Sequence, residues 1–289
     1  MVDPAERARL DSPVDAATRL FFIVGHPVDH VRAPVVWSAL MRRHGVNAVF
    51  LAADIAPQSI DAGIRGLKAM RNVDGLMFTM PHKVAAMTHA DTLTERARRV
   101  GSINLLRPNR DGTWTGDNVD GAGFIAGLAD HDIAVRGRRV HVHGAGGVGA
   151  NIAWSLAAEG PASLNVFDLD AARATDLAHR IAGATGVAAT SGAPRLSDVD
   201  LAVNASPLGL DAGDPLPFDP AHLPAGSAVA DVVMDPVHTA LLKAAASRGL
   251  ITHHGRHMMN YAMPLAAAFF GLPTDVDWNG GPLQNPAGA

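Results

Sequence analysis

Three glycines at positions 144, 146 and 149 complete the pattern G-x-G-x-x-G within RRVHVHGAGGVG, residues 138–149. The first glycine permits a tight turn, the second lets the backbone approach a pyrophosphate, and the third lets a helix pack closely on a strand. The N–H groups and positive dipole end of the following helix, expected over 150–159, attract phosphates. A purely structural glycine turn is the alternative. We therefore predict a dinucleotide-binding loop made of Gly144, Ala145, Gly146, Gly147, Val148 and Gly149.

The next apolar segment, 163–167, ends at Asp168. The dinucleotide fingerprint places a carboxylate about 20 residues beyond its glycines, where it accepts hydrogen bonds from the ribose hydroxyls. A carboxylate in that place repels a 2′-phosphate. Asp168, followed by Leu169, therefore predicts that NAD is preferred over NADP. The alternative is that Asp168 only caps the next turn.

A dinucleotide site favours hydride transfer, in which the cofactor carries the hydride and the protein handles the hydroxyl proton. A partly buried lysine can transfer that proton, and a neighbouring carboxylate can orient it. Lys83 follows an apolar strand and Pro81, and Asp120 lies at the junction between two halves of the chain. Ligands bind at the carboxyl ends of strands in open α/β sheets, which favours Lys83. The alternative is that both are solvated surface charges.

The elements that position these residues alternate between strand and helix. Strands are expected at 20–24, 48–53 and 75–80 and a hairpin at 101–116. A second series of strands, expected at 140–143, 163–167, 200–204 and 228–233, is typical of a doubly wound nucleotide-binding half. The predicted fold class is α/β, with mostly parallel sheets in two domains. The first predicted domain comprises 18–119 plus 256–275, because the apolar helix 257–270 is expected to return to it. The second is a Rossmann-type domain over 120–255.

Composition limits the classes of function. The 289 residues are 48% hydrophobic and 18% charged with a net charge of −4, which supports two cores but no basic surface for nucleic acid or membranes. The absence of cysteine excludes disulfides, thiolate nucleophiles and cysteine-ligated zinc. A charged N-terminus and the lack of a long apolar run predict a cytoplasmic protein. We expect a small-molecule substrate and a monomer or homodimer.

Histidines near the end of the chain have the spacing of a weak metal motif. His253, His254 and His257 lie close together, but Gly255 interrupts the pattern and no carboxylate is nearby in sequence. We therefore expect no metal site, and a surface or cleft-lining role for these residues. His82, beside Lys83, either faces a cleft or lies on the exposed side of a helix.

Six short segments in register resemble the shikimate dehydrogenase family, which includes quinate/shikimate dehydrogenases. The resemblance covers roughly residues 20–272 and implies an N-terminal substrate domain, a C-terminal Rossmann domain and a cleft between them. It also implies reversible oxidation of a ring hydroxyl of a cyclohexane carboxylate, a reaction of aromatic amino acid biosynthesis. The segments are TMPHK (79–83), INLL (103–106), GDNVDG (116–121), GAGG (144–147), NASPLG (204–209) and DPVHTALL (235–242).

The resemblance implies roles for particular residues. The family's catalytic lysine and aspartate fall on Lys83 and Asp120, and its substrate-contacting threonine and asparagine on Thr79 and Asn104. By the same pattern, the nicotinamide half of the cofactor lies against Val232 and Gly255.

Several polar positions of the family pattern are apolar here. The substrate loop H-S-x-S-P reads His30-Val31-Arg32-Ala33-Pro34, so both hydroxyls that hold the substrate carboxylate are gone. A hydrogen bond to a charged group contributes about 1.5–3 kcal/mol, so the two losses weaken binding by roughly two to four decades. We expect a more apolar substrate, or a carboxylate held by Arg32, Arg256 or His257. The other departures from the family pattern are Met77, Val119, Met234 and Ala262.

The function predicted from the sequence is therefore an NAD(P)-dependent dehydrogenase with an altered pocket in which Lys83 and Asp120 handle the hydroxyl proton. One alternative is an ordinary shikimate dehydrogenase, reducing 3-dehydroshikimate, or a quinate dehydrogenase. An alternative from another class is a non-catalytic NAD-binding sensor. The presence of both Lys83 and Asp120 disfavours the sensor, because a binding protein needs neither.

Overall fold

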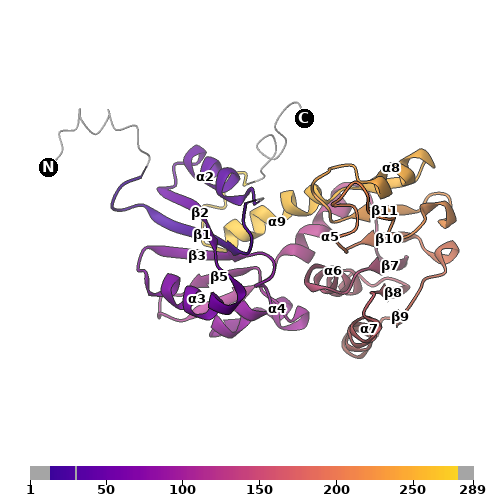
Figure 1. Cartoon of the computed structure of the whole chain (residues 1–289), viewed down its shortest axis with the longest axis horizontal. Coiled ribbons are helices and arrows are strands. Elements are labelled where there is room, and N and C mark those ends of the chain that lie inside the picture. The colour runs from indigo at the N-terminus through magenta and orange to yellow at the C-terminus, as the bar shows by residue number, and fades with distance from the viewer. Residues whose placement is uncertain (1–13, 30, 279–289) are drawn as a thin grey trace. The chain divides into compact units, whose positions relative to one another are not determined.

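The computed structural model describes residues 14–29 and 31–278, which form two compact units (Figure 1). The first unit contains the described residues up to Thr94, Ser102–Asp117 and the described residues from Phe269 onward. The second unit contains Glu95–Gly101 and Asn118–Ala268. Each unit holds one six-stranded, mostly parallel sheet with helices, which confirms the predicted α/β fold class.

The sheet of the first unit has the strand order β2-β1-β3-β5-β6-β4. Strand β1 pairs in parallel with β2 and with β3, and β5 and β6 form the expected antiparallel hairpin. The elements are β1 (Arg19–Gly25), α2 (Ala33–Arg43), β2 (Ala48–Asp54), η1 (Pro57–Ser59), α3 (Ile60–Ala69), β3 (Val73–Phe78), η2 (Ala85–His89), β4 (Thr92–Leu93), β5 (Leu105–Pro108) and β6 (Trp114–Asp117).

Aromatic side chains form the core on one face of this sheet. Phe21 stacks on Phe50 at a centroid distance of 6.1 Å, and Trp37 of α2 stacks on Phe50 at 5.7 Å. Phe270 meets the edge of Phe21 at 5.2 Å. A Cβ atom at Gly75 would lie 2.5 Å from the Phe270 ring, so β3 carries a glycine where that ring packs. The residues just after α9 therefore belong to the core of the first unit.

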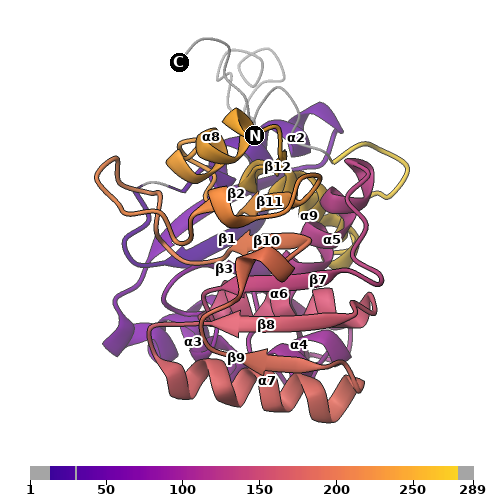
Figure 2. The same ribbon diagram turned by 90° about the vertical axis from the view of Figure 1, so that its right-hand side faces the viewer.

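The sheet of the second unit is entirely parallel, with the order β12-β11-β10-β7-β8-β9 (Figure 2). Numbered from β7, this is the 3-2-1-4-5-6 order of a dinucleotide-binding fold, and the order reverses between β7 and β10. The elements are α4 (Glu95–Val100), α5 (Asp120–Asp130), β7 (Arg139–His143), α6 (Gly147–Ala158), β8 (Ser163–Phe167), α7 (Ala171–Thr185), β9 (Ala189–Ser191), η3 (Leu196–Asp198), β10 (Leu201–Asn204), η4 (Pro220–His222), β11 (Ala228–Asp231), α8 (Ala240–Ser247), β12 (Ile251–His253) and α9 (Gly255–Phe269).

The boundaries of the two units differ from the expected ones at helix α9. We expected 256–275 to join the first domain, but the helix groups with the second unit as far as Ala268. A Cβ atom at Gly123 of α5 would lie 2.7 Å from the Cβ of Ala262 and 2.6 Å from the carbonyl of Met258. The missing side chain at Gly123 therefore lets α9 pack directly on α5. The assignment of the units to substrate and cofactor stays a prediction.

Some local elements also differ from expectation. Lys83 lies in a turn over 81–84 that precedes η2, not in a regular helix. The short edge strands β9 and β12 were not expected, because three residues carry too little periodicity to be recognised. Among the described residues, no helix is both long and apolar enough to cross a membrane.

His141 lies in the middle of β7 and is fully buried. Its Nδ1 is 2.9 Å from the Oδ1 of Asn165. Burial lowers the pKa of His141 to about 4, although the bond to Asn165 opposes this effect. Below about pH 6.5 the unfolded chain binds a proton at this residue that the folded chain does not bind until pH approaches about 4. The free energy of unfolding therefore falls as the solution is acidified through this window.

We predict that His141→Val makes the free energy of unfolding less sensitive to acid between about pH 6.5 and 4. The slope decreases by up to one proton, or about 1.4 kcal/mol per pH unit, because the group that protonates on unfolding is gone. Urea unfolding at several pH values within the window measures the slope. The control is His179→Ala, an exposed residue of α7, which leaves the slope unchanged. Equal slopes for His141→Val and the unsubstituted protein would contradict the prediction.

Candidate functional site

The glycine-rich turn after β7 is tightly packed on one side and open on the other. Gly144 has φ +111°, and a Cβ atom there would lie 2.7 Å from the carbonyl oxygen of Ala205. A Cβ atom at Gly149 would collide with the backbone carbonyl of Gly144. At Gly146 and Gly147, by contrast, no described atom lies within 4 Å of such a Cβ. The turn therefore excludes side chains where helix meets strand and presents bare backbone on its outer face.

Helix α6 begins at this turn, with Gly146 as its N-cap residue. Within the described chain, no side chain caps this end of the helix. The first N–H groups of a helix have no acceptor within the helix, so those of Gly147, Val148 and Gly149 are oriented to bind an anion. This arrangement fits the pyrophosphate of a dinucleotide. Together with the 3-2-1-4-5-6 strand order, it supports the predicted cofactor loop.

The carboxylate of Asp168 braces the same turn from β8. Its Oδ2 accepts a hydrogen bond from the Ala145 N–H at 2.7 Å, and its Oδ1 accepts one from the Asp170 N–H at 2.8 Å. The Nη1 of Arg173 lies 3.8 Å from Oδ2, and the Asp168 side chain is only 13% exposed. Leu169, between Asp168 and Asp170 in the chain, is 94% exposed. Both oxygens of Asp168 are therefore engaged by the protein itself, as in the capping alternative.

In the first unit, backbone hydrogen bonds bring Thr79, Lys83 and Asn104 together. The Thr79 N–H donates to the carbonyl of Val24 at 3.0 Å, so the segment after β3 stays beside the end of β1. The Ile103 N–H donates to the Lys83 carbonyl at 2.9 Å, and the Phe78 N–H donates to the Asn104 carbonyl at 2.8 Å. Thr79 and Lys83 are half-buried and Asn104 is 6% exposed. Three predicted site residues therefore share one edge of the first sheet.

The loop after β1 reaches helix α2, which begins at Ala33 with Arg32 as its N-cap residue. Val31 and Ala33 are half-buried, and Arg32 is exposed. Position 30 lies outside the described residues. Val31 and Ala33 carry no hydroxyl, so a substrate near this helix start meets methyl groups and a guanidinium.

Asp120 is the first residue of α5, in the second unit. Its N–H donates to the Oδ1 of Asn118 at 3.3 Å, and the same oxygen accepts a hydrogen bond from the Nδ2 of Asn151 in α6. Val119, between Asn118 and Asp120 in the chain, is buried. Asp120 itself is half-buried. The start of α5 is thereby anchored to α6, which holds the predicted catalytic carboxylate at a defined place in its unit.

The remaining predicted residues of the second unit, Val232, Met234 and Gly255, lie together. A Cβ atom at Gly255 would collide with the Val232 carbonyl, so the start of α9 packs directly on the chain after β11. The Nε of Arg256 donates to the Met234 carbonyl at 3.1 Å. Met234 is 39% exposed.

A buried polar network that we did not predict supports this region. The Nδ2 of Asn204 donates to the Oδ1 of Asp231 at 3.0 Å, and the hydroxyl of Thr239 donates to its Oδ2 at 2.7 Å. Burial raises the pKa of Asp231, although these bonds oppose the effect. The network joins the segments NASPLG and DPVHTALL. The polar residues of these two segments are visible in the sequence, but only the fold shows that the segments meet.

His82 takes neither of the two positions considered for it. It is 1% exposed, and its Nε2 lies 2.7 Å from the carbonyl oxygen of Ile55. The imidazole therefore braces the chain after β2 against the turn that carries Lys83.

Comparison with known proteins gives consistent matches along the chain. A family model described as the shikimate dehydrogenase substrate binding domain matches residues 23–106. The shikimate dehydrogenase (NADP(+)) of Rubrobacter xylanophilus is 37% identical over 269 residues, covering 91% of this chain and 94% of that protein. The enzyme of the same name from Methylobacterium radiotolerans is 37% identical over 89% of this chain and 93% of its own length.

Solved structures agree with these relatives. A shikimate dehydrogenase in complex with NADP+ matches with a TM-score of 0.86 and 27% identity, covering 94% of this chain and 95% of that one. A 5-ketofructose reductase of Gluconobacter matches with a TM-score of 0.83 and 27% identity, covering 92% of this chain and 96% of that one. A quinate dehydrogenase from Corynebacterium glutamicum in complex with NAD matches with a TM-score of 0.80 and 29% identity, covering 92% of this chain and 97% of that one.

The expectation that NAD is preferred over NADP is wrong. The curated relatives named above, and a third from Rhodospirillum rubrum, are NADP(+) enzymes by name. The structure supplies the physical reason. The expectation required a carboxylate at Asp168 that faces the ribose, whereas both of its oxygens accept backbone hydrogen bonds and Arg173 lies beside it.

Proposed function

The chain belongs to the shikimate dehydrogenase family, and we propose that it uses NADP to interconvert a ring hydroxyl and a ketone on a substrate that fits a more apolar pocket than the family pattern provides. At the coarser level, the protein is an oxidoreductase that acts on CH–OH groups with NAD(P), of the shikimate and quinate dehydrogenase type. The observation that carries the finer proposal is the absence of hydroxyls at Val31 and Ala33 while Thr79, Lys83 and Asn104 lie together.

The proposed roles of the residues follow from the chemistry of alcohol oxidation. When bound, the nicotinamide supplies the hydride acceptor or donor. Lys83 takes the hydroxyl proton during oxidation and returns it during reduction, and Asp120 shares in that transfer. Thr79 and Asn104 hold the substrate through hydrogen bonds.

Among the cations considered for a substrate carboxylate, we propose Arg32. Arg32 is exposed at the start of α2, beside the two positions that have lost hydroxyls. A single guanidinium replaces two hydroxyl contacts, so recognition of the carboxylate differs from that of the family pattern.

One structural relative supports a changed substrate. The 5-ketofructose reductase shares the fold at 27% identity, and its named substrate is a ketose without a carboxylate. This fold therefore accommodates substrates outside the cyclohexane carboxylates. The second candidate is an ordinary shikimate dehydrogenase, favoured by the 37% identity to enzymes of that name.

A screen of hydroxylated compounds with NADP+ separates these candidates. We predict that shikimate and quinate are poor substrates, because the two missing hydroxyl contacts weaken binding by roughly two to four decades. A cyclic hydroxy acid with fewer ring hydroxyls, whose carboxylate Arg32 can hold, should be oxidised with a higher kcat/KM. The control is the double substitution Val31→Ser and Ala33→Ser, which should improve shikimate turnover specifically. Ordinary kcat and KM values for shikimate in the unsubstituted protein would establish the second candidate instead.

Replacement of the proposed proton-transfer group tests whether the protein is an enzyme of this type. We predict that Lys83→Ala lowers kcat on the best substrate at least about a hundredfold, because the hydroxyl proton loses its acceptor. Binding of NADP, measured by calorimetry, stays unchanged. Lys243→Ala in α8, an exposed lysine, is the matched control and retains activity. NADP binding without turnover of any alcohol by the unsubstituted protein would favour the sensor.

We further propose that Arg173 contacts the 2′-phosphate of NADP. Its side chain is 52% exposed and lies beside the turn between β8 and α7, 3.3 Å from Asp170. A hydrogen bond to a charged group contributes about 1.5–3 kcal/mol, so we predict that Arg173→Ala raises the KM for NADP+ about 10- to 100-fold. The KM for NAD+, which lacks this phosphate, changes little.

The matched control for this experiment is Arg180→Ala on the same helix, where the arginine pairs with Asp176. It should alter neither KM. An equal rise in the KM values for NADP+ and NAD+ in Arg173→Ala would show that Arg173 only supports the turn.

A further inference from the structure

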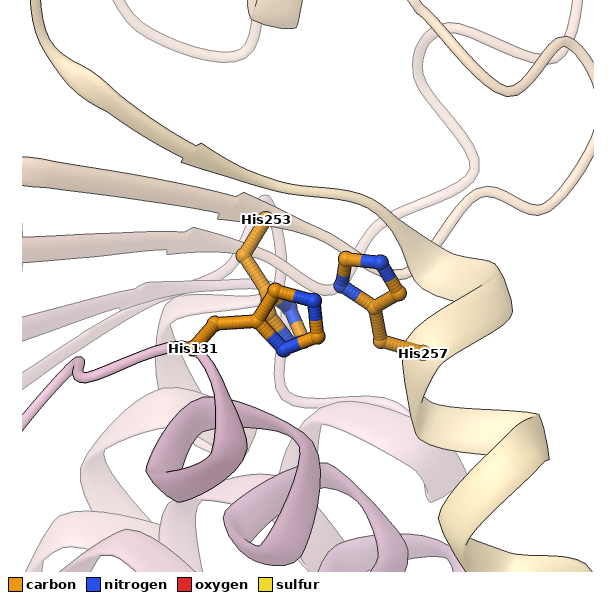
Figure 3. Close-up of side chains that lie close together, drawn as sticks. All are labelled: His131, His253 and His257. Atoms are coloured by element: carbon orange, nitrogen blue, oxygen red, sulfur yellow. The ribbon is translucent and has the colours of Figure 1, made fainter.

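Three histidines from separate elements of the second unit meet at one point (Figure 3). His131 directly follows α5, His253 ends β12, and His257 lies in the first turn of α9. Each offers a ring nitrogen within 4.8 Å of those offered by the other two. In Figure 3 the three imidazoles point toward one another from their different elements.

The hydrogen bond of His131 determines which of its nitrogens carries a lone pair. Its Nδ1 lies 2.8 Å from the carbonyl oxygen of Gly127. A carbonyl only accepts, so Nδ1 carries the proton and Nε2 is left with a lone pair. Metal-binding histidines commonly hold their second nitrogen in this way, by donation to a backbone carbonyl. His131 is thus prepared to act as a ligand through Nε2.

His253 is buried and His257 is half-buried, and both rings have buried nitrogens without a well-aligned hydrogen-bond partner among the described residues. His253 is fully buried, and neither of its nitrogens makes a well-aligned hydrogen bond to a described residue, although the Gly127 carbonyl lies beside the ring. The buried Nδ1 of His257 also lacks a partner within the described ranges. An unsatisfied buried polar atom destabilises a protein by about 1–3 kcal/mol, so these atoms call for a partner that the side chains do not supply.

The helices on either side hold the cluster in place. A Cβ atom at Gly127 of α5 would lie 3.1 Å from the Nε2 of His253, so a side chain there would press on the ring. One turn earlier, Gly123 lets α9 approach α5 closely. The hydroxyl of Tyr261 in α9 donates to the carboxylate of Asp130, next to His131. The separation of the ligands is therefore set by a close helix pair and not by flexible loops.

We propose that His131, His253 and His257 form a site for a divalent transition metal ion, with Zn²⁺ as the expected occupant. Imidazole nitrogen suits Zn²⁺, Cu²⁺ and Ni²⁺, whereas Mg²⁺ and Ca²⁺ prefer oxygen. Zinc binds histidine at about 2.0–2.1 Å, which places tetrahedral ligands about 3.3 Å apart. Small rotations of the three rings close the present separation of up to 4.8 Å. Water completes the coordination.

The site is distinct from the proposed reaction centre. His131 and Asp120 stand at opposite ends of α5, about 16 Å apart at 1.5 Å per residue. The ion would link the end of α5 to the start of α9, the two helices through which the chain enters and leaves the second unit. We infer a structural role, in which the metal stabilises this helix pair.

No metal site was expected here, because the residues near His257 in the sequence do not form a ligand set by themselves. His131 lies more than a hundred positions earlier in the chain, and Gly255 does not interrupt a helical motif because His253 belongs to β12.

Calorimetric titration of the chelator-treated full chain with Zn²⁺ at neutral pH tests the proposal. We predict one Zn²⁺ per chain and a rise in the melting temperature, because the ion binds only the folded state. His131→Ala, at an exposed position, should weaken binding at least about tenfold, and His257→Ala should do the same, since even indirect contacts to metal ligands change affinity by about 10- to 100-fold. Co²⁺ substitution should give the visible spectrum of a tetrahedral site.

The exposed His179 provides the matched control, and His179→Ala should bind Zn²⁺ as the unsubstituted protein does. Circular dichroism establishes that each variant is folded. If His257→Ala does not fold, His131→Ala alone decides the outcome. Failure of the unsubstituted protein to bind one equivalent, or equal affinity in folded His131→Ala, would overturn the proposal.

Discussion

Helix α6 can meet strand β7 only because two glycines face each other there. A side chain at Gly149 would begin inside the carbonyl group of Gly144, and Gly144 in turn lies against Ala205 at the end of β10. This contact places the start of α6 at the point where the strand order reverses. Asp168 then ties the turn to β8 through the Ala145 N–H. The predicted cofactor loop is thus held by close backbone packing, and its outer face presents bare backbone at Gly146 and Gly147.

Glycines also permit close packing in α5, where they occur on successive turns of the helix. Gly121 faces Asn151 and Ser155 of α6, whereas Gly123 and Gly127 face α9 and β12. One helix therefore contacts the cofactor-loop helix on one side and the histidine cluster on the other. Asp120, at its first turn, takes its position from these contacts. A metal ion at the far end of α5 would stabilise the helix that carries the proposed catalytic carboxylate.

The proposed substrate half depends on a different interaction. Backbone hydrogen bonds from Ile103 and Phe78 hold the segments 79–83 and 103–104 beside each other, so the main chain itself places Lys83 and Asn104. Side chains in the neighbouring loop can therefore change without disturbing them. Such a separation of positioning from recognition would allow the proposed change of substrate at Val31 and Ala33 while the reaction type is kept.

The sequence by itself determined the α/β class, most strands and helices and the glycine turn, because periodicity and glycine spacing are local properties of the chain. It did not determine the cofactor preference, since Asp168 has the expected type and spacing but its oxygens accept backbone hydrogen bonds, one from Ala145 in the glycine-rich turn and one from Asp170. The buried roles of His82 and Asp231 likewise depend on partners distant in sequence. The convergence of His131 with His253 and His257 was decided only by the tertiary structure, because the packing of α9 on α5 joins residues that no local pattern relates.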